Sequence, residues 1–369
     1  MTERAILIVG AGPSGLTAAL ELARRGFRPR IVDCAEAPPE ESRALAINPR
    51  SLAILKPLGL SDRLIEAGTP IRKAYLRGPE RLLLQIDLSA LPKPYDFMLM
   101  LPQSETERLM AEHLAELGIE VERSTTLLAM TQDAEGNTAE LRGPDGALET
   151  CRPDMVIGAD GAHSVTRQAI GQDFVGSAYE HQWGLADATI ETDLPLDGIN
   201  FFDRAPNLAA IFPIKGRRVR LLSDREAVLD SLPPEVRVAE VHWTSTFRIS
   251  HRLVERYRSG NVFLVGDAAH IHSPFGGRGM NLGIEDAAWL AWLIDEGDTA
   301  GYTVARRPVA KEVIETVDPA TRFMASDGAL QKFVRRRIVP LLGALGLVQR
   351  RMLPIVSAQN TPFPPWLRR

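Results

Sequence analysis

Residues 5–15 read Ala5-Ile6-Leu7-Ile8-Val9-Gly10-Ala11-Gly12-Pro13-Ser14-Gly15. The apolar residues at 5–9 predict a buried parallel strand, and the turn leads into a helix that we expect to end at Gly26. A second strand at 30–32 ends at Asp33. This is the dinucleotide-binding fingerprint in its full context, where Gly10, Gly12 and Gly15 permit a tight turn, the approach of a pyrophosphate and close helix packing. An acid at this distance binds an unphosphorylated ribose, which favours FAD or NAD over NADP.

A second corner of the same kind follows the apolar strand Val262-Phe263-Leu264-Val265 and reads Gly266-Asp267-Ala268-Ala269-His270-Ile271-His272-Ser273-Pro274-Phe275-Gly276-Gly277-Arg278-Gly279-Met280-Asn281-Leu282-Gly283-Ile284-Glu285-Asp286. Asp267 can accept hydrogen bonds from ligand hydroxyls, and the glycines at the start of the next helix let amide N–H groups approach an anion. A ligand that is both polyol and anion suits this site, as the phosphorylated ribitol of a flavin does. Taken alone, the stretch also fits a sharp strand-to-helix corner without a ligand.

A further acid and glycines follow the strand predicted at 154–157, in Gly158-Ala159-Asp160-Gly161. We interpret His163, just beyond, as a loop histidine without a catalytic role. Elsewhere, a short helix is expected to close at Gly59, and another to run from Gln103 to Leu117. From the residues alone, Arg43 is either a phosphate or ring contact or an exposed loop charge, and Gln103 either reaches a ligand or caps its helix.

The alternation of strands and helices is interrupted twice. Residues 72–89 read as a β-hairpin, and residues 174–251 as strands of alternating character without helices between them. We therefore expect an α/β protein with a Rossmann-like FAD-binding domain, an inserted antiparallel β-sheet substrate domain and a helical C-terminal region. The predicted FAD-binding domain comprises 1–71, 97–172 and 261–295, the substrate domain 72–96 and 173–260, and the helical segment 296–369.

Composition places the chain among ordinary globular proteins. Its 369 residues suit two packed domains, and its net charge of −4 gives no reason to expect nucleic acid or an anionic membrane as partner. Two cysteines without metal-ligand spacing favour a reducing cytoplasm, and no metal or signal peptide is expected. The apolar stripe Val334, Ile338, Leu341, Leu345 and Val348, beside Arg335–Arg337, fits a membrane-surface or partner helix, but we favour coverage of the chain's own core.

The three corners in chain order, with the β excursion between the second and the third, resemble the flavoprotein aromatic hydroxylases, single-component FAD monooxygenases of the para-hydroxybenzoate hydroxylase type. The likeness covers about residues 4–295 and rests on Gly10–Gly15, on Gly158–Gly161 with Arg167, and on Gly266–His270. The chain departs from the family at Asp33, where Glu is more common, and at Arg278, where Gln is common. From its length, we also expect it to lack the thioredoxin-like domain of some members of the family.

The resemblance implies an FAD site made of Gly10, Gly12, Pro13, Ser14, Gly15, Asp33, Arg43, Gln103, Asp160, Gly266, Asp267, Pro274, Gly279, Met280 and Asn281. Within it, Asp33 would bind the adenosine ribose, Asp267 the ribitol, and the amides of Met280 and Asn281 the pyrimidine edge, where reduction places negative charge. Arg43 and Gln103 would lie against the pyrophosphate and ribitol. Asp160 would support the path of the nicotinamide, and Pro274 would lie beside the reactive C4a carbon.

The implied reaction uses NADPH or NADH transiently, and O₂, to form a flavin C4a-hydroperoxide that hydroxylates a small aromatic or polycyclic phenol. It needs no catalytic side chain, and the expected assembly is a monomer or homodimer. Candidates for the pocket are Trp183, Phe201, Phe202, Phe212 and Pro213, with Arg220 and His181 as polar anchors, although we favour plain packing in the sheet core for the apolar ones. The alternatives are an oxidase or dehydrogenase reduced by its own substrate, and a flavin-carrying interaction protein without turnover.

Overall fold

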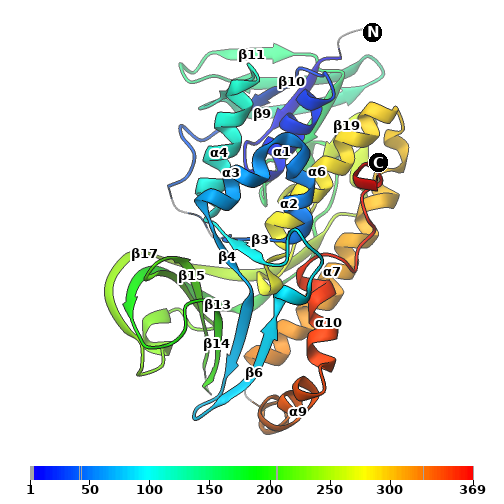
Figure 1. Cartoon of the computed structure of the whole chain (residues 1–369). Helices are drawn as coiled ribbons and strands as arrows, with labels where there is room; N and C mark the ends of the chain where they lie inside the picture. Colours follow the sequence, from blue (N-terminus) through cyan, green and yellow to red (C-terminus); the bar gives the residue numbers. More distant parts are fainter. Residues whose placement is uncertain (1–3, 41, 43, 205–206, 327, 369) are drawn as a thin grey trace.

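The computed structural model describes residues 4–40, 42, 44–204, 207–326 and 328–368. A six-stranded sheet in the order β18-β19-β12-β1-β2-β8 forms one half of the molecule (Figure 1). Its strands are Arg258–Ser259, Val262–Leu264, Met155–Gly158, Ile6–Val9, Arg30–Val32 and Val121–Glu122. All neighbours pair in parallel except β18 and β19. The Rossmann-like half predicted from the fingerprint is therefore confirmed.

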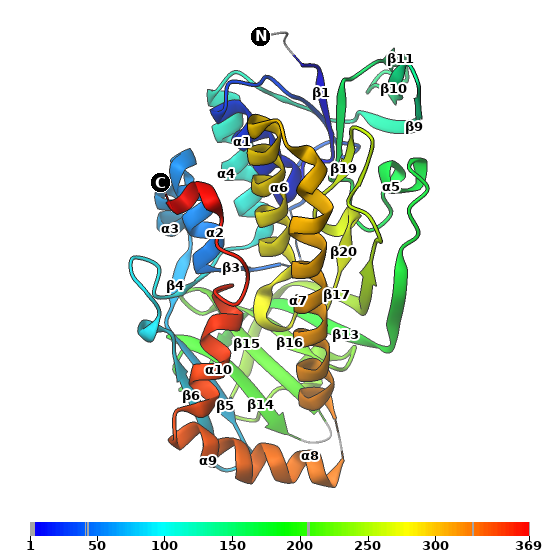
Figure 2. The ribbon, with the colours of Figure 1, turned by 90° about the vertical axis from the view of Figure 1, so that its right-hand side faces the viewer.

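Helices α1 (Pro13–Arg24), α4 (Gln103–Glu116) and α6 (Gly279–Glu296) cover one face of this sheet, and β9 (Thr126–Asp133), β10 (Gly136–Arg142) and β11 (Leu148–Cys151) form a small sheet on the other side (Figures 1 and 2). The largest hydrophobic cluster joins the sheet to α1 and α6, and it includes Ile8, Leu16, Leu20, Leu282 and Leu290, each fully buried. This packing fixes the N-terminal ends of α1 and α6 beside each other, at the carboxyl edge of the sheet.

An eight-stranded sheet makes the other half, in the order β20-β17-β13-β16-β15-β14-β5-β6. The bounds of its strands are His270–Ile271, Arg237–Leu253, Val175–Glu191, Arg218–Ser223, Asn207–Lys215, Gly198–Arg204, Lys73–Arg77 and Leu82–Asp87. The hairpin β5–β6 joins this sheet, as expected. The sheet is antiparallel, as expected, at every pairing of its described strands except one, where β14 pairs with β5 in parallel.

Two local features add detail to the expectations. The helix expected to close at Gly59 is α2 (Pro49–Leu55) with a following 3-10 turn, and Gly59 (φ 74°) then leads directly into another helix, α3 (Leu60–Ala67). A small sheet of β3 (Ala46–Ile47), β7 (Met98–Met100) and β4 (Thr69–Ile71) was also not predicted. Strands this short leave no periodic pattern in the sequence.

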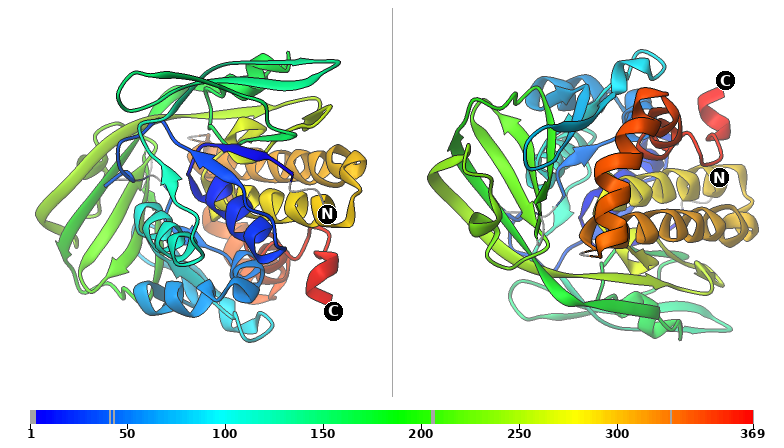
Figure 3. Two further views of the ribbon diagram at one scale, coloured as in Figure 1. Left: turned by 90° about the horizontal axis from the view of Figure 1, so that it is seen from above. Right: turned by 90° about the horizontal axis from the view of Figure 1, so that it is seen from below.

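The C-terminal region is helical, with α7 (Tyr302–Ala325), α8 (Ala329–Phe333), a π-helical turn at Val334–Ile338, α9 (Val339–Ala344) and α10 (Leu347–Val356). Seen from below, these helices lie beside the curved eight-stranded sheet (Figure 3). Among the described residues no single helix has the length and apolar character needed to cross a bilayer. One bent pair, Ala329–Ala344 and Leu347–Val356 at 93°, meets that test by length and composition only.

Candidate functional site

The fingerprint corner between β1 and α1 depends on close backbone contacts. Gly10 has φ 101°, and a Cβ built on it would lie 2.4 Å from the carbonyl oxygen of Ala159. The Ala11 amide donates to Asp33 Oδ2 at 2.6 Å, so the acid at the end of β2 holds this turn directly. The N-terminus of α1 has no acidic residue in its first turn and therefore suits an anion.

The Asp-Gly corner after β12 is tied to the Gly-Asp corner after β19. Asp160 accepts hydrogen bonds from the Ser164 hydroxyl (2.5 Å) and from the Thr166 amide (2.9 Å) and hydroxyl (3.0 Å), which fixes the start of α5 (Val165–Ala169). Arg167 donates to the carbonyl oxygens of Ala162 at 2.9 Å and Ala268 at 3.2 Å. The two corners are therefore held together by one guanidinium group.

The Gly-Asp corner and the start of α6 form the loop that faces the second half of the molecule. Gly276 and Gly277 adopt φ 78° and 63°, a left-handed conformation that favours glycine. The Asn281 side chain donates to the Ala46 carbonyl at 2.8 Å and to the Gly277 carbonyl at 2.6 Å, and its oxygen accepts from the Asn48 amide at 2.9 Å. Asn281 thus joins the glycine loop to the β3–α2 connection through hydrogen bonds of both its amide nitrogen and its amide oxygen.

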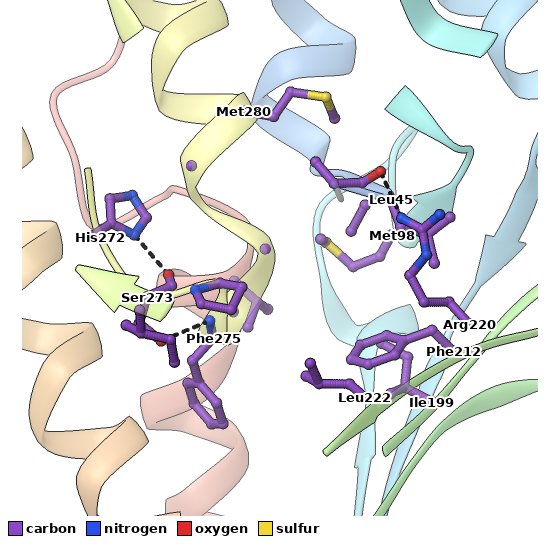
Figure 4. A pocket seen from close by; sticks show the side chains of 18 of the residues that line it. Leu45, Met98, Ile199, Phe212, Arg220, Leu222, His272, Ser273, Phe275 and Met280 are labelled. Atoms are coloured by element: carbon purple, nitrogen blue, oxygen red, sulfur yellow. Dashed lines mark hydrogen bonds between the residues drawn. The ribbon is translucent and has the colours of Figure 1, made fainter. Parts of the chain in front are cut away.

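One cavity of ≈ 1060 Å³ extends from the fingerprint corner to the eight-stranded sheet. Figure 4 shows His272, Ser273, Phe275 and Met280 on one side of it and Ile199, Phe212, Arg220 and Leu222 on the other. Its volume slightly exceeds the range of roughly 300–1,000 Å³ typical of small-molecule pockets. The cavity can therefore hold a large cofactor together with a second ligand.

The residues of the first part of the cavity fit FAD. Gly12, Pro13 and Ser14 line it at the start of α1, and Gly279 and Met280 line it at the start of α6, so two helix N-termini meet one elongated space. A Cβ on Gly12 or Gly279 would have no neighbour closer than 3.9 Å, which leaves room for a ligand at both turns. The buried Nε2 of His272 has no hydrogen-bond partner in the part of the chain that the structure describes, so the cavity offers a polar atom to a ligand.

The far part of the cavity is apolar and is closed by helices that the sequence did not assign to the site. Val339 of α9 and Val348, Met352 and Val356 of α10 line it, together with Leu84 and Ile86 of β6 and Leu88 of the following 3-10 turn. Each of these positions holds an ordinary apolar residue of a helix, strand or turn, so no local signal distinguishes it from a core residue.

One charged residue of the sheet wall, Arg220, belongs to a buried ion pair. Arg220 lies directly opposite Asp187 on the neighbouring strand and binds it through two bonds of 2.7 and 2.9 Å, with both side chains buried. Arg220 also donates to the Ala44 carbonyl at 3.2 Å. Because the Arg220–Asp187 pair is satisfied, it adds little net charge to the wall that a ligand would meet.

The predicted site residues fall into three groups. Those that line the cavity are Gly12, Pro13, Ser14, Gln103, Asp267, Pro274, Gly279, Met280, Phe201, Phe212 and Arg220. Those that do not are Gly10, Gly15, Asp33, Asp160, Gly266, Asn281, His181, Trp183, Phe202 and Pro213, although Trp183 lines a small adjacent cavity of ≈ 20 Å³. Arg43 lies outside the described residues. The glycines and Asp33 of the second group instead stabilise the turns on which residues of the first group lie.

Similarity to known proteins shows the family to which the chain belongs. A family model described as an FAD binding domain matches residues 3–223 and 223–316. The chain belongs to the flavoprotein aromatic hydroxylase family.

Two relatives and one solved structure illustrate this flavoprotein family. The chain is 34% identical to 6-methylpretetramide 4-monooxygenase of Streptomyces rimosus, over 93% of its own length. It is 35% identical to pentachlorophenol 4-monooxygenase of Sphingobium chlorophenolicum, over 85% of its length. It spans 64% and 63% of these two relatives. In fold it is similar to p-nitrophenol 4-monooxygenase of Pseudomonas putida, with a TM-score of 0.85, 24% identity and coverage of 96% and 98% of the two chains.

A buried histidine in the flavoprotein's Gly-Asp corner predicts a pH dependence of stability. Burial lowers the pKa of His272 to about 3, and nearby His270, Arg278 and His251 act in the same direction against the opposing Ser273 carbonyl. Unfolded chains bind this proton near pH 6.5, so stability from His272 is complete above that pH and is lost as the pH falls toward 3. We expect a slope of up to about 1.4 kcal/mol per pH unit in that window.

The free energy of unfolding, measured by denaturant titration of the FAD-bound protein across this pH range, checks the expectation. His272→Gln should flatten the slope, and His163→Gln, which changes an exposed histidine, should leave it unchanged. An equal slope in all three proteins would contradict the assignment to His272.

Proposed function

We propose that the chain is an FAD-dependent monooxygenase that consumes NADH or NADPH and O₂ and hydroxylates an aromatic substrate, either a small phenol or a polycyclic one. The cavity of ≈ 1060 Å³ carries the proposal, because one end meets two helix N-termini and the other ends in an apolar chamber. The names of the relatives support both sizes of substrate, since one acts on pentachlorophenol and another on 6-methylpretetramide.

Bound FAD would supply the activation of oxygen, which no protein side chain performs. The start of α1 would bind the pyrophosphate, Gln103 and Asp267 would bind the ribitol chain, and the amides at the start of α6 would face the pyrimidine edge. The Asp33 carboxylate already accepts from the amides of Ala11 and Ala35, and it is proposed to contact the adenosine ribose through a remaining lone pair.

The remaining residues would position the substrate and exclude water. Phe212, Ile199 and Leu222 from the sheet and Met352 and Val348 from α10 form apolar walls around the chamber. Such walls keep water from the reacting centre and hold a planar ring by contact area. Arg220, kept in place by Asp187, is proposed to donate a hydrogen bond to a phenolic oxygen.

A substrate screen tests the proposal. We expect the purified FAD-bound protein to oxidise NADH or NADPH slowly alone and at least about tenfold faster with a phenol that fits the chamber, with hydroxylated product detected by mass spectrometry. No stimulation by any phenol would contradict the proposal. Anaerobic bleaching of the flavin by the phenol without nicotinamide would instead identify an oxidase or dehydrogenase.

Two variants of one helix provide the matched control. Met352→Trp fills the chamber from α10 and should lower kcat/KM for the best phenol by about 10- to 100-fold, because overpacking costs about 1–3 kcal/mol. Leu347 lies on the same helix but is 48% exposed, so Leu347→Trp should leave kcat/KM unchanged. Equal effects of the two changes would show that the substrate does not occupy this chamber.

A further inference from the structure

The outer face of the α8–α10 region carries an unusual concentration of exposed apolar side chains. Leu330, Phe333, Leu341, Leu345 and Leu347 are 70%, 56%, 59%, 63% and 48% exposed. The first four recur at helical spacing along the nearly continuous helical run 329–345, so they form one stripe. The favoured expectation that this segment covers the chain's own core is therefore wrong for Leu341 and Leu345, while Val334, Ile338 and Val348 are half-buried.

The opposite face of the same helices packs against the rest of the chain. Val339, Val348 and Met352 line the cavity, and a Cβ on Gly343 would lie 2.4 Å from Leu84, so α9 packs tightly on β6. Arg335 and Arg336 bind Asp203 at 3.1 and 2.9 Å, which fixes the π-helical turn to β14. These contacts hold the segment against the sheet, so the exposed stripe cannot turn inward without breaking them.

The charge of this segment is strongly one-sided. Residues 329–356 contain Lys332, Arg335, Arg336, Arg337, Arg350 and Arg351 and no acidic residue, although the whole chain has a net charge of −4. Arg337, Arg350 and Arg351 are exposed, and none of them forms an ion pair with another described residue. On α10, Leu347, Arg350 and Arg351 share the face opposite to the cavity.

We propose that the outer face of α8–α10 docks on the surface of an anionic lipid bilayer. Exposed leucines and a phenylalanine flanked by unpaired arginines are the pattern of a helix that lies in the interfacial plane, with its apolar side chains between the acyl chains and its cations among anionic headgroups. The segment forms one end of the molecule, where α8 and α9 run across the lower edge, so a flat surface can reach it (Figure 2).

A bilayer explains this face better than a second copy of the chain. A two-fold contact would place the unpaired Arg337, Arg350 and Arg351 of both copies near one another without an acidic partner in the segment. The docking does not depend on the proposed function. One consequence does rest on it, because a docked molecule would place the chamber wall next to the lipid phase, into which uncharged aromatic molecules partition.

Vesicle sedimentation of the full-length, FAD-bound protein tests the proposal. We expect the protein to sediment with vesicles of phosphatidylcholine mixed with phosphatidylglycerol, and to remain in solution with phosphatidylcholine alone or at high salt. Leu341→Ser/Leu345→Ser and Arg350→Glu/Arg351→Glu should each weaken the binding about tenfold or more. The matched control, Leu148→Ser/Val304→Ser, changes residues that are 76% and 78% exposed elsewhere and should bind like the wild type.

Failure of the wild type to sediment with either vesicle would overturn the proposal, as would binding by both patch variants at wild-type strength. A wild-type dimer that ignores vesicles and that Leu341→Ser/Leu345→Ser converts to a monomer in light scattering would assign the face to a second copy instead. Phenol-stimulated NADH and NADPH oxidation is measured on the same preparations without vesicles, so the docking and the proposed reaction can fail separately.

Discussion

The Gly15→Ala variant is expected to purify without FAD. A Cβ on Gly15 would lie 1.9 Å from the carbonyl oxygen of Gly10 and 3.2 Å from the Cβ of Ala159. The first contact is with backbone that itself forms the fingerprint turn, so α1 must move away from β1 and β12. Since the start of α1 would bind the pyrophosphate, a shift of this kind should weaken FAD binding about 100-fold, the result of overpacking that costs about 3 kcal/mol.

The visible absorption of the purified protein and titration of the apoprotein with FAD measure this effect. Gly301→Ala is the matched control, because a Cβ there would meet no atom within 4 Å. Circular dichroism separates loss of the cofactor from loss of the fold. A Gly15→Ala protein with full flavin content would show that the turn tolerates a side chain and would remove the physical basis for the FAD site.

The largest loss of stability is expected from Asp286→Asn. Asp286 is fully buried on α6, where its two oxygens accept from His270 Nε2 and Arg306 Nε, both at 2.6 Å. Burial alone would raise the pKa of this carboxyl, but Arg306 and His270 outweigh it and hold the pKa below its usual range. The pair is therefore ionised, and its contribution to stability is present at neutral pH and is lost only as the pH falls through that lowered pKa.

Replacing this carboxylate leaves the buried Arg306 with Glu285 alone, at 3.2 Å, and should cost about 3–5 kcal/mol of unfolding free energy. Asp295→Asn is the control on the same helix, because Asp295 is 47% exposed and its ion pair with Arg25 spans 3.6 Å, a type worth about 0–1 kcal/mol. Denaturant titration of both variants makes the comparison. Equal losses would mean that the buried pair adds no more than an exposed one.

The structural features that can be predicted from the sequence are those that leave a pattern within a short stretch of residues. Each ligand-type corner combines an apolar strand, an acid or glycine turn and a helix within about 30 residues, so the Rossmann-like half and its three corners could be identified. The hairpin at 72–89 and the strands at 174–251 were visible from their alternation.

What sequence did not show depends on contacts between distant residues. Asp187 and Arg220 meet because two strands pair in one register, and Asp286 meets Arg306 because α6 and α7 lie side by side. Neither pairing has a signal at either residue alone. The C-terminal apolar residues were recognised as a helical stripe, but periodicity cannot say which face of a helix meets the chain and which meets its surroundings.

Three separate stretches of chain contribute to the wall around the chamber, the hairpin β5–β6, the strands β13–β17 and the helices α9 and α10. Parallel pairing of β14 with β5 and the packing of Gly343 on Leu84 join these stretches to one another. A chimera that grafts only the contiguous block 173–260 from one relative into another would therefore combine mismatched partners at two seams. Transfer of substrate preference should require all three stretches to be exchanged together.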